Sequence, residues 1–500
     1  MSPSPTLTRR IAMAIALMVG FYLLALTMAA GLLYLPLAAA QSTGESNAWV
    51  TTYCMLGAGL ILWSVAPRRD RFKPPGPRLR PADQPRLFAE LESVARATGQ
   101  TMPSEVYLIL DLNASVSERG GVMGFGGRRV MGLGLPLMQL LTVPQFRGVI
   151  AHEFGHYQAG DTRLLPWIHK THGAVARMLD SSSSPTGFLG LLRLPFTLYG
   201  RWYLRLTQAD SRRQEFAADA LAARIVGPAC VLSGLRAIQR ASSVYEEFLT
   251  KEFLPVMGAG FLPPLAEGFH HFLRTADGTA ELSAESEVTG ESEKADPYDS
   301  HPSFPERFAA LGSIPAESAT AEGPLAVTLL EHLPALESEL LPAAFVENGQ
   351  GQPQPVSWNE VGIRVYAPHW RRLVEANRST LSGIELSDLP WIARNPSDLA
   401  RRLRGADGQE LSEDSWEAGV AYAVGAALSL NLLERGWSLE ISPGMPERMT
   451  GPAGPLHPFA LIGELASGER GWSDWSEFLS RAGLADAALL PGMPQPPESA

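Results

Sequence analysis

The sequence predicts an α+β fold that is predominantly helical, and three observations support this prediction. Apolar residues recur at helical spacing in many segments, whereas only a few short runs have the β-branched and apolar composition of strands. Two long apolar segments lie near the amino terminus, at residues 11–40 and 48–66. The 500-residue chain is 45% hydrophobic, which is enough for several folded units. We therefore expect two apolar helices, a mixed domain with a small β-sheet, and an α-rich region.

The composition limits the possible partners. The formal net charge is −11, which argues against a nucleic-acid partner. The charge is uneven, because about the first eighty residues are basic whereas residues 281–299 are acidic. The two cysteines, Cys54 and Cys230, lie far apart, so neither a disulfide framework nor a second metal site of cysteines is indicated. This cysteine usage fits a reducing compartment.

The two amino-terminal apolar segments are typical of a transmembrane hairpin. The first runs from Ile11 to Ala40 without a charged residue, long enough to cross a bilayer with some tilt. The second, residues 48–66, carries Trp49 and Trp63 near its ends, where tryptophan favours the membrane interface. A polar link, residues 41–47, joins them. We expect spans at about 11–36 and 48–66 within an amino-terminal domain of residues 1–73.

Basic residues predict the orientation of this hairpin. They flank both outer ends and are Arg9, Arg10, Arg68, Arg69, Arg71 and Lys73. Because basic flanks stay on the cytoplasmic side, the chain after Lys73 is expected to be cytosolic. The sequence thus predicts a multi-pass protein of the cell membrane, in bacteria the inner membrane.

The alternative for the first forty residues is a secretory signal, with a cleavage site at residues 38–40 and a twin-arginine flag. The apolar core is far longer than the roughly seven to fifteen residues typical of such signals. Even after cleavage, the second span would leave the following domain inside.

The motif His-Glu-x-x-His at residues 152–156 points to metal chemistry. Positions four residues apart share one face of an α-helix, so His152 and His156 can bind one ion, with Glu153 beside them to handle a proton. A helix is expected here because Thr142 and Gln145 have the spacing of an N-terminal capping box. Two surface histidines on a helix are the alternative, so a third ligand decides between the two interpretations.

That third ligand is expected at Glu215, about sixty residues later on a second predicted helix. Two histidines and one glutamate are a standard set for a catalytic zinc, which keeps one position open for water. Asp219, one helical turn further on, is placed to accept the other N–H of a ligating histidine. A metzincin site is excluded, because it needs glycine and histidine where Ala159 and Thr162 stand. The alternative is that Glu215 and Asp219 lie on a solvent-exposed acidic face of the helix. Together with the histidine motif, however, the two carboxylates predict one Zn²⁺ per chain.

These motifs resemble the membrane-linked gluzincin metalloproteases, typified by the HtpX heat-shock protease and the CAAX prenyl endopeptidase. Three further features match: Asn113-Ala114 after a strand, a glycine-rich hairpin before the histidine helix, and Ser300-His301-Pro302 followed by Glu306-Arg307. The resemblance covers residues 74–312 and implies a zincin-like metalloprotease domain.

The resemblance also implies roles for individual residues. Glu153 would be the catalytic base and then the acid, His301 would reach the oxyanion or the substrate carbonyl, and Arg307 would fix that region. For His301 the alternative is a neighbour of the cap of the following helix. The family lays an extended substrate along a sheet edge, and we expect this edge at the strand Arg129, Val130, Met131, Gly132 and Leu133.

The remaining segments carry no second catalytic motif. The glycine-rich run 120–134 lacks the spacing and the lysine of a phosphate-binding loop, so turn and strand are expected. Residues 187–206 contain three arginines and predict an amphipathic helix on the protein or membrane surface. Residues 313–500 predict an α-rich accessory domain, with Trp472, Trp475 and Phe478 in its core.

The predicted function is a membrane-anchored zinc-dependent endopeptidase that hydrolyses misfolded or membrane polypeptides. The expected partners are a polypeptide substrate and the bilayer; the oligomeric state is not indicated. One alternative is a prenyl-protein processing protease with the same site. The other alternative is a catalytically silent scaffold. The presence of all four residues argues against it; they are His152, Glu153, His156 and Glu215.

Overall fold

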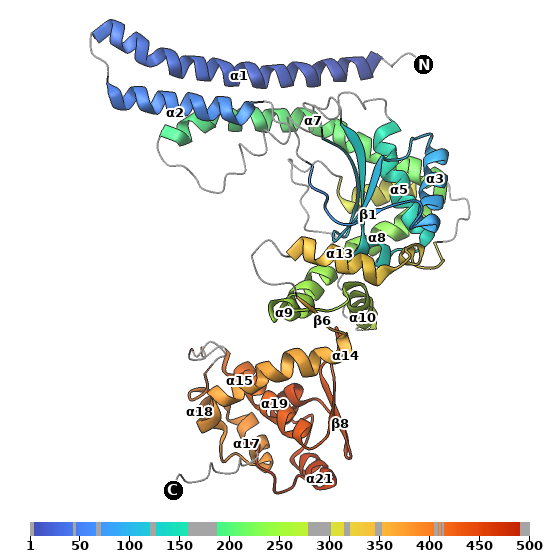
Figure 1. The fold of residues 1–500 in the computed structure, drawn as a ribbon, viewed down its shortest axis with the longest axis vertical. Coiled ribbons are helices and arrows are strands. Elements are labelled where there is room, and N and C mark those ends of the chain that lie inside the picture. The colour runs from blue at the N-terminus through green and yellow to red at the C-terminus, as the bar shows by residue number, and fades with distance from the viewer. Residues whose placement is uncertain are drawn as a thin grey trace. The chain divides into compact units, whose positions relative to one another are not determined.

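The computed structural model forms two compact units, and it is mostly helical with small sheets, as the sequence predicts (Figure 1). The described residues are 5–43, 47–66, 72–120, 127–158, 188–278, 302–314, 321–345, 353–404, 409, 412 and 415–490. The first unit comprises residues 1–240 and 285–344, and the second comprises 241–284 and 345–500. The units are therefore interleaved along the sequence, and the domain boundary expected after residue 312 stays a prediction.

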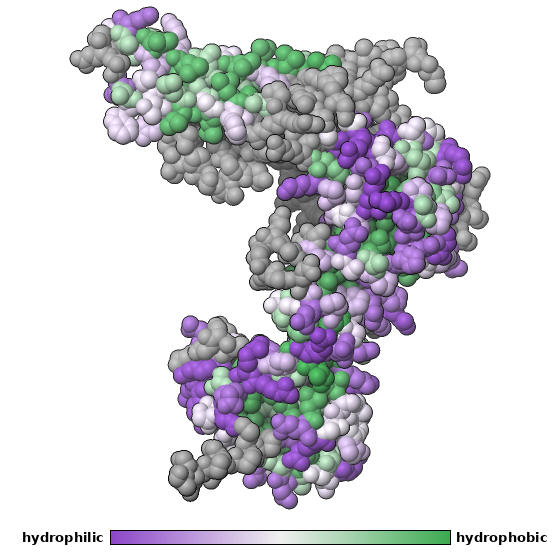
Figure 2. Space-filling model, in the orientation of Figure 1, coloured by the Kyte–Doolittle hydropathy of each residue, from purple (hydrophilic) through white to green (hydrophobic). Residues whose placement is uncertain are grey.

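Two apolar helices begin the first unit, α1 (Pro5–Thr43) and α2 (Ala48–Val65). The side chain of Asn47 caps α2 by accepting hydrogen bonds from the backbone N–H groups of Trp49 (3.0 Å) and Val50 (3.3 Å). Phe21, Ala25, Ala29, Cys54, Ala58 and Ile61 pack between the helices. The outer faces remain apolar, with exposed side chains at Leu23, Leu26, Leu35, Leu37, Leu56, Leu60 and Trp63 (Figure 2). An apolar surface of this kind needs lipid or protein to cover it.

Among the described residues, two helical segments are long and apolar enough to cross a membrane, Ile15–Ser42 and Trp416–Glu434. The first lies in α1. The second is α19 (Trp416–Glu434) of the second unit, and 61% of it is buried, so packing within its own unit accounts for its apolar character. The segment predicted as the second span forms α2, whose apolar part, Ala48–Trp63, is shorter, so its crossing of a membrane stays a prediction.

A four-stranded sheet follows in the order β1 (Arg78–Leu79), β2 (Glu105–Ile109), β4 (Arg128–Gly134) and β3 (Ala114–Arg119). Strand β4 pairs with β2 in parallel and with β3 antiparallel. The prediction that Arg129, Val130, Met131, Gly132 and Leu133 form the substrate edge is therefore wrong, since both sides of this strand are occupied. The edge beside β4 is β3, whose alternating burial leaves its serines exposed.

Helices pack around this sheet and carry the histidine motif. They are α3 (Pro85–Thr98), α4 (Leu135–Leu140), α5 (Val143–Gln158), α7 (Phe188–Val226), the first part of α8 (Pro228–Glu247), α12 (Phe304–Gly312) and α13 (Leu333–Phe345). The core residues Phe146, Ile150 and Phe154 make one face of α5 fully buried. The opposite side of α5 remains available for the motif.

Helix α7 differs from the short amphipathic helix expected at 187–206, because it continues without interruption to Val226. Its amino-terminal part packs on the apolar hairpin, where Phe196 and Tyr199 lie 6.0 and 6.1 Å from the ring of Phe21. The hydroxyl of Tyr199 donates to the carbonyl of Leu17. One helix thus connects the hairpin with the part of the chain that carries Glu215.

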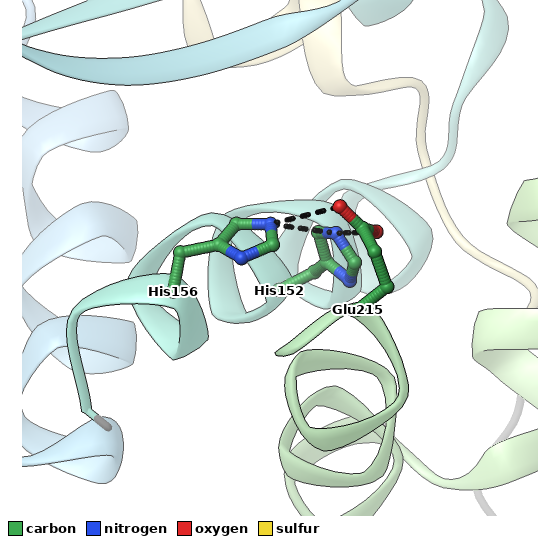
Figure 3. Close-up of side chains that lie close together, drawn as sticks. All are labelled: His152, His156 and Glu215. Atoms are coloured by element: carbon green, nitrogen blue, oxygen red, sulfur yellow. Dashed lines mark hydrogen bonds and ion pairs between the residues drawn. The ribbon is translucent and has the colours of Figure 1, made fainter. Parts of the chain in front are cut away.

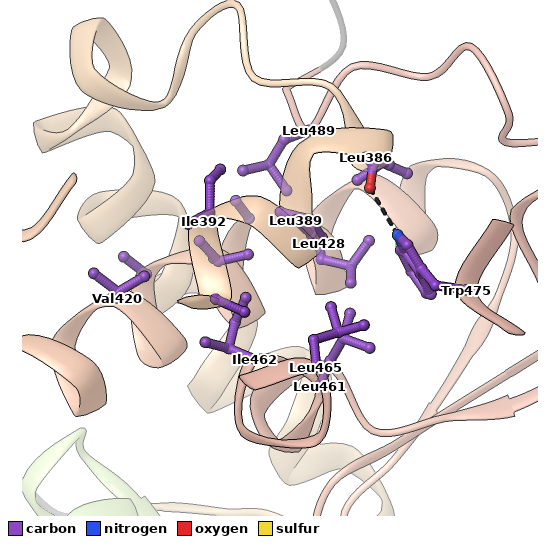
Figure 4. Packing of buried hydrophobic residues seen from close by; sticks show 14 of the residues in the cluster. Leu386, Leu389, Ile392, Val420, Leu428, Leu461, Ile462, Leu465, Trp475 and Leu489 are labelled. Carbon is purple, nitrogen blue, oxygen red and sulfur yellow. Dashed lines mark hydrogen bonds between the residues drawn. The ribbon is translucent and has the colours of Figure 1, made fainter. Parts of the chain in front are cut away.

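The second unit is built around α19. Its other elements are a π-helix (Phe248–Phe253), α9 (Leu254–Gly258), α10 (Leu265–Gly278), α14 (Trp358–Val361), α15 (Ala367–Ala376), α17 (Leu389–Arg394), α18 (Pro396–Ala400), α20 (Pro458–Ser467), α21 (Trp472–Ala482), the strand pair β5 (Phe261–Leu262) and β6 (Gln354–Pro355), and the strands β7 (Ser438–Glu440), β8 (Arg448–Gly451) and β9 (Gly454–Leu456). Leu428 and Leu461 are fully buried in its core, and the indole N–H of Trp475 donates to the carbonyl of Leu386 over 2.8 Å (Figure 4). The core position predicted for Trp472 is wrong, as 56% of this side chain is exposed.

Candidate metal centre

Three side chains that the sequence singled out meet in the first unit (Figure 3). The Nε2 atoms of His152 and His156 lie 3.2 Å apart. Glu215 reaches them from α7, with Oε2 3.4 Å from His152 Nε2 and Oε1 3.7 Å from His156 Nε2. Glu215 is 4% exposed, so its carboxylate sits in a largely dry site. Such an arrangement of converging lone pairs favours a bound cation.

The local sequence explains why the histidines stand where they do. The backbone N–H of Thr142 donates to the Gln145 side chain (2.9 Å), and the Gln145 N–H donates to the Thr142 hydroxyl (3.4 Å). This reciprocal capping confirms the predicted start of α5. From there the helix carries His152 and His156 on one face, one turn apart.

A glycine brings the second helix close enough to supply the carboxylate. A Cβ atom placed on Gly155 would lie 2.9 Å from the Cα of Ala218. Helices α5 and α7 therefore approach closely between the two histidines on one side and Glu215 and Asp219 on the other. The glycine inside the histidine motif is thus part of the construction of the site.

Asp219 holds His152 in one orientation. It is 1% exposed, and its Oδ1 lies 2.9 Å from Nδ1 of His152. The other side of the carboxylate is bound by Arg307, whose Nε and Nη2 donate over 2.8 and 2.6 Å. Since Arg307 fixes Asp219 as an anion, the natural donor is Nδ1–H of His152, which leaves Nε2 as a lone pair facing His156 and Glu215.

The helix that carries Arg307 is itself tied to α7. Its first turn is closed by a capping box between Ser303 and Glu306, in which Glu306 accepts from the Ser303 N–H (2.9 Å). Glu306 also accepts a hydrogen bond from Arg212, three residues before Glu215. This pairing was not predicted from the sequence. The signal was available, since Arg212 and Glu306 carry opposite charges to which no other role was assigned.

The charges around the site favour a cation. Burial alone lowers the pKa of His152, but hydrogen bonds to Asp219 and Glu215 outweigh it and raise the pKa to about 9. For Asp219, the hydrogen bonds from Arg307 and His152 overcome burial and hold the pKa below its usual range. The site therefore favours a positive charge at His152, which either a proton or a metal ion can supply. A metal ion bound to Nε2 would take the place of the proton on that atom.

The donor set fits a small divalent ion. Zinc bonds of about 2.0–2.2 Å to nitrogen and oxygen at tetrahedral angles place neighbouring donor atoms about 3.3–3.5 Å apart. The separations of 3.2, 3.4 and 3.7 Å between His152, His156 and Glu215 are close to this spacing. The set supplies three ligands and leaves one position for another molecule.

Glu153 lies between the histidines and the sheet. Burial raises the pKa of its carboxyl to about 7, and the Val116 backbone on β3 forms a hydrogen bond that opposes the rise. The carboxylate is therefore next to the edge strand of the sheet as well as beside His152. An acid with a pKa near neutrality is suited to accept and return a proton.

The remaining predicted catalytic residue, His301, lies outside the described residues. The structure brings together His152, Glu153, His156 and Glu215, with Asp219 and Arg307 behind them. Strand β3, which was not predicted from the sequence, forms the edge of the sheet beside the strand that contains Arg129–Leu133.

Comparison with known proteins agrees with this construction. Residues 81–314 match the model of Peptidase family M48. The match covers a little under half of the chain. The family is that of the HtpX and CAAX metalloproteases, which confirms the resemblance stated on the motifs, over nearly the same residues. The matched residues contain all the side chains of the site, and the match supports metallopeptidase activity. No solved structure matches the chain.

Proposed function

We propose that the chain is a zinc-dependent endopeptidase of the gluzincin type with a zincin-like catalytic domain, anchored in a membrane. The observation that carries the proposal is the convergence of His152, His156 and Glu215 within 4.8 Å, next to Glu153. The family match supports the same chemistry, since M48 enzymes are metallopeptidases that generally use zinc.

The zinc ion would supply a Lewis acid for the scissile carbonyl and for a water molecule. Every other step falls to the protein. Glu153 takes a proton from the attacking water and returns it to the leaving amine, because its raised pKa suits both transfers. Asp219 and Arg307 keep the imidazole of His152 oriented throughout. The role of His301 at the oxyanion remains part of this proposal.

Strand β3 is the natural binding place for an extended substrate. Its outer edge is adjacent to Glu153, since the backbone of Val116 hydrogen-bonds to that carboxylate. Backbone groups at alternate residues of an edge strand point outward, which gives Ala114, Val116 and Glu118 this direction. Main-chain pairing tolerates many side chains, so the enzyme should accept varied polypeptides.

The apolar hairpin supports the membrane part of the proposal. Helix α1 contains a segment of 28 residues with a mean hydropathy of 2.1, and α2 adds a second apolar helix. The basic flanks on both outer sides favour a multi-pass arrangement with the catalytic domain in the cytoplasm. Misfolded or membrane polypeptides are the proposed substrates.

The decisive experiment compares the purified full-length chain with its Glu153→Gln variant. The parent is expected to contain about one zinc per chain and to cleave casein. The variant should keep zinc by elemental analysis and lose at least about a thousandfold in kcat. Equal cleavage by both proteins, or a parent without zinc, contradicts the proposal.

Two other functions give different results in the same preparation. A prenyl-protein processing enzyme would cleave a farnesylated CAAX peptide and leave casein intact. A silent scaffold would bind zinc but cleave neither substrate. The presence of Glu153 beside the metal ligands favours an active enzyme, since a scaffold has no need of an acid whose carboxyl pKa is raised to about 7.

A further inference from the structure

One end of the four-stranded sheet concentrates positive charge. Arg119 at the end of β3 and Arg128 at the start of β4 are direct cross-strand partners. Both guanidinium groups lie over the ring of Phe72, each 5.6 Å from its centre. Arg119 and Arg128 therefore bring two like charges to one aromatic ring at this end of the sheet.

A carboxylate pairs with two of the arginines at this end of the sheet. Glu105 lies 2.8 Å from Arg128 and 3.5 Å from Arg78, and it also accepts from the hydroxyl of Tyr107. Its own side chain is 11% exposed, whereas those of Arg78 and Arg128 are 47% and 51% exposed. The buried acid therefore positions the arginines while their charged ends face solvent.

We call the residues Arg78, Arg119 and Arg128 the basic sheet end. They contribute three positive charges, and Glu105 is the described acid that pairs with two of them, in a chain whose net charge is −11. This local excess departs from the character of the chain as a whole. A surface of this kind attracts a multivalent or polymeric anion.

The position of the basic sheet end along the chain indicates which anion. Phe72 follows Ala66, the end of the apolar helix α2, by six residues, which span at most about 22 Å when extended. The intervening sequence contains Arg68, Arg69 and Arg71 together with one acid, Asp70. Basic residues next to the exit of an apolar segment are the usual signature of contact with anionic lipid headgroups.

We propose that the basic sheet end binds the phosphodiester groups of anionic phospholipids. Guanidinium groups suit this partner because their planar N–H donors can bind two phosphate oxygens at once. Phe72, held between two guanidinium groups and packed 5.6 Å from the ring of Tyr107, keeps them in place for the contact.

The consequence concerns the substrate and rests on the proposed function. Arg119 and Val116 are three residues apart on the same strand, which is about 10 Å. If Arg119 contacts lipid, Val116, which lies beside Glu153 on the outer edge of β3, is then within about 10 Å of the bilayer surface. The preferred cleavage sites would be those a few residues outside a membrane segment.

The test uses the full-length Glu153→Gln chain in a neutral detergent, so that it does not depend on catalysis. Binding of dioctanoyl phosphatidylglycerol and dioctanoyl phosphatidylcholine is measured by native mass spectrometry, and hydrogen exchange locates the contact. The variant is Arg119→Gln/Arg128→Gln. The matched control is Arg364→Gln/Arg401→Gln, which removes two arginines that also lie over aromatic rings, at 5.0 and 5.5 Å, in the second unit.

Phosphatidylglycerol is expected to bind more tightly than phosphatidylcholine and to protect β3 and β4. The variant should weaken this binding roughly thirtyfold, because each basic residue near an anionic surface contributes about fivefold. The control should leave it unchanged. Arg119→Lys/Arg128→Lys, which keeps the charge, should retain most of the binding even if the glutamine variant folds poorly.

Three results would overturn the inference. They are equal binding of the two lipids, unchanged binding by the glutamine variant, and full competition by inorganic phosphate at the same concentration. Preference for an acidic peptide over phosphatidylglycerol would likewise overturn it, in favour of substrate recognition. Failure of zinc-dependent cleavage by the parent would end the proposed function without touching these lipid measurements.

Discussion

Gly155 of α5 and Ala218 of α7 lie so close together that a Cβ atom on the glycine would meet the alanine Cα at 2.9 Å and its Cβ at 3.0 Å. Both neighbours belong to a helix backbone or sit directly on it, so neither can rotate away. The distance between the two helices at this point sets how far Glu215 stands from the histidines. A contact without any charge thus controls the geometry of the metal centre.

We therefore predict that Gly155→Ala weakens metal binding. The added methyl group should force the helices apart by several tenths of an ångström and lower zinc affinity by at least about tenfold, an effect of about 1.4 kcal/mol. Competition with a chromogenic chelator measures the affinity. The control is Gly463→Ala on α20, where an added Cβ meets nothing within 4 Å and zinc affinity should be unchanged.

Asp219→Asn should separate orientation from charge at the carboxylate that holds His152. The amide can present the wrong group to Nδ1 of His152 and loses the ion pair with Arg307. Zinc affinity is expected to fall about 10- to 100-fold. Arg307→Lys keeps the positive charge but not the two parallel hydrogen bonds to Asp219. Its zinc affinity should therefore fall less than that of Asp219→Asn. Equal affinities in all three proteins would show that the chain Arg307–Asp219–His152 does not support the metal.

Proline substitutions can test the edge strand. The Val116 N–H points outward to Glu153. Because backbone N–H groups alternate in direction along a strand, the N–H of Ser117 points towards β4. We expect Val116→Pro to fold, bind zinc and lose most of its kcat/KM for peptides, since proline is tolerated where the N–H faces away from the ladder. Ser117→Pro should instead lower the unfolding temperature. Full peptidase activity in Val116→Pro would remove β3 from substrate binding.

The second unit should depend on pH through Glu252. Burial raises the pKa of this carboxyl, with Glu447 and Glu247 adding to the rise. A group whose pKa is raised in the folded state stabilises the fold at low pH, and this contribution is lost as the pH rises through the raised value. Glu252→Gln should therefore unfold at higher temperature than the parent at pH 8, and the difference should vanish near pH 4. Glu434→Gln, at an exposed position, serves as the control.

The sequence could predict the chemistry of the site because its spacing is local. His152 and His156 share a face on any helix, and the distant carboxylate could be inferred from the ligand set that zinc needs. The capping pair of Thr142 and Gln145 was equally local, and it forms as expected. The meeting of α5 and α7 was foreseeable only through the family motifs.

The errors arose where neighbours in space decide the outcome. Arg129–Leu133 has the apolar composition of a strand, but composition does not say whether one or both edges are paired. The polar strand β3 completes the sheet by pairing with β4. Because its serines face solvent, its sequence lacks the apolar run by which strands were predicted. Trp472 shares the spacing of the buried Trp475 but stands at the first turn of α21, where its side chain stays exposed.

Helix α7 joins two places that are otherwise separate in the chain: Tyr199, which contacts α1, and Glu215, which faces the histidines. Sixteen residues of helix separate them, about 24 Å. A rigid rod of that length turns a tilt of about 5° at one end into a displacement of about 2 Å at the other. Because bilayer thickness influences the tilt of apolar helices, a change in thickness would then change the distance between Glu215 and the two histidines.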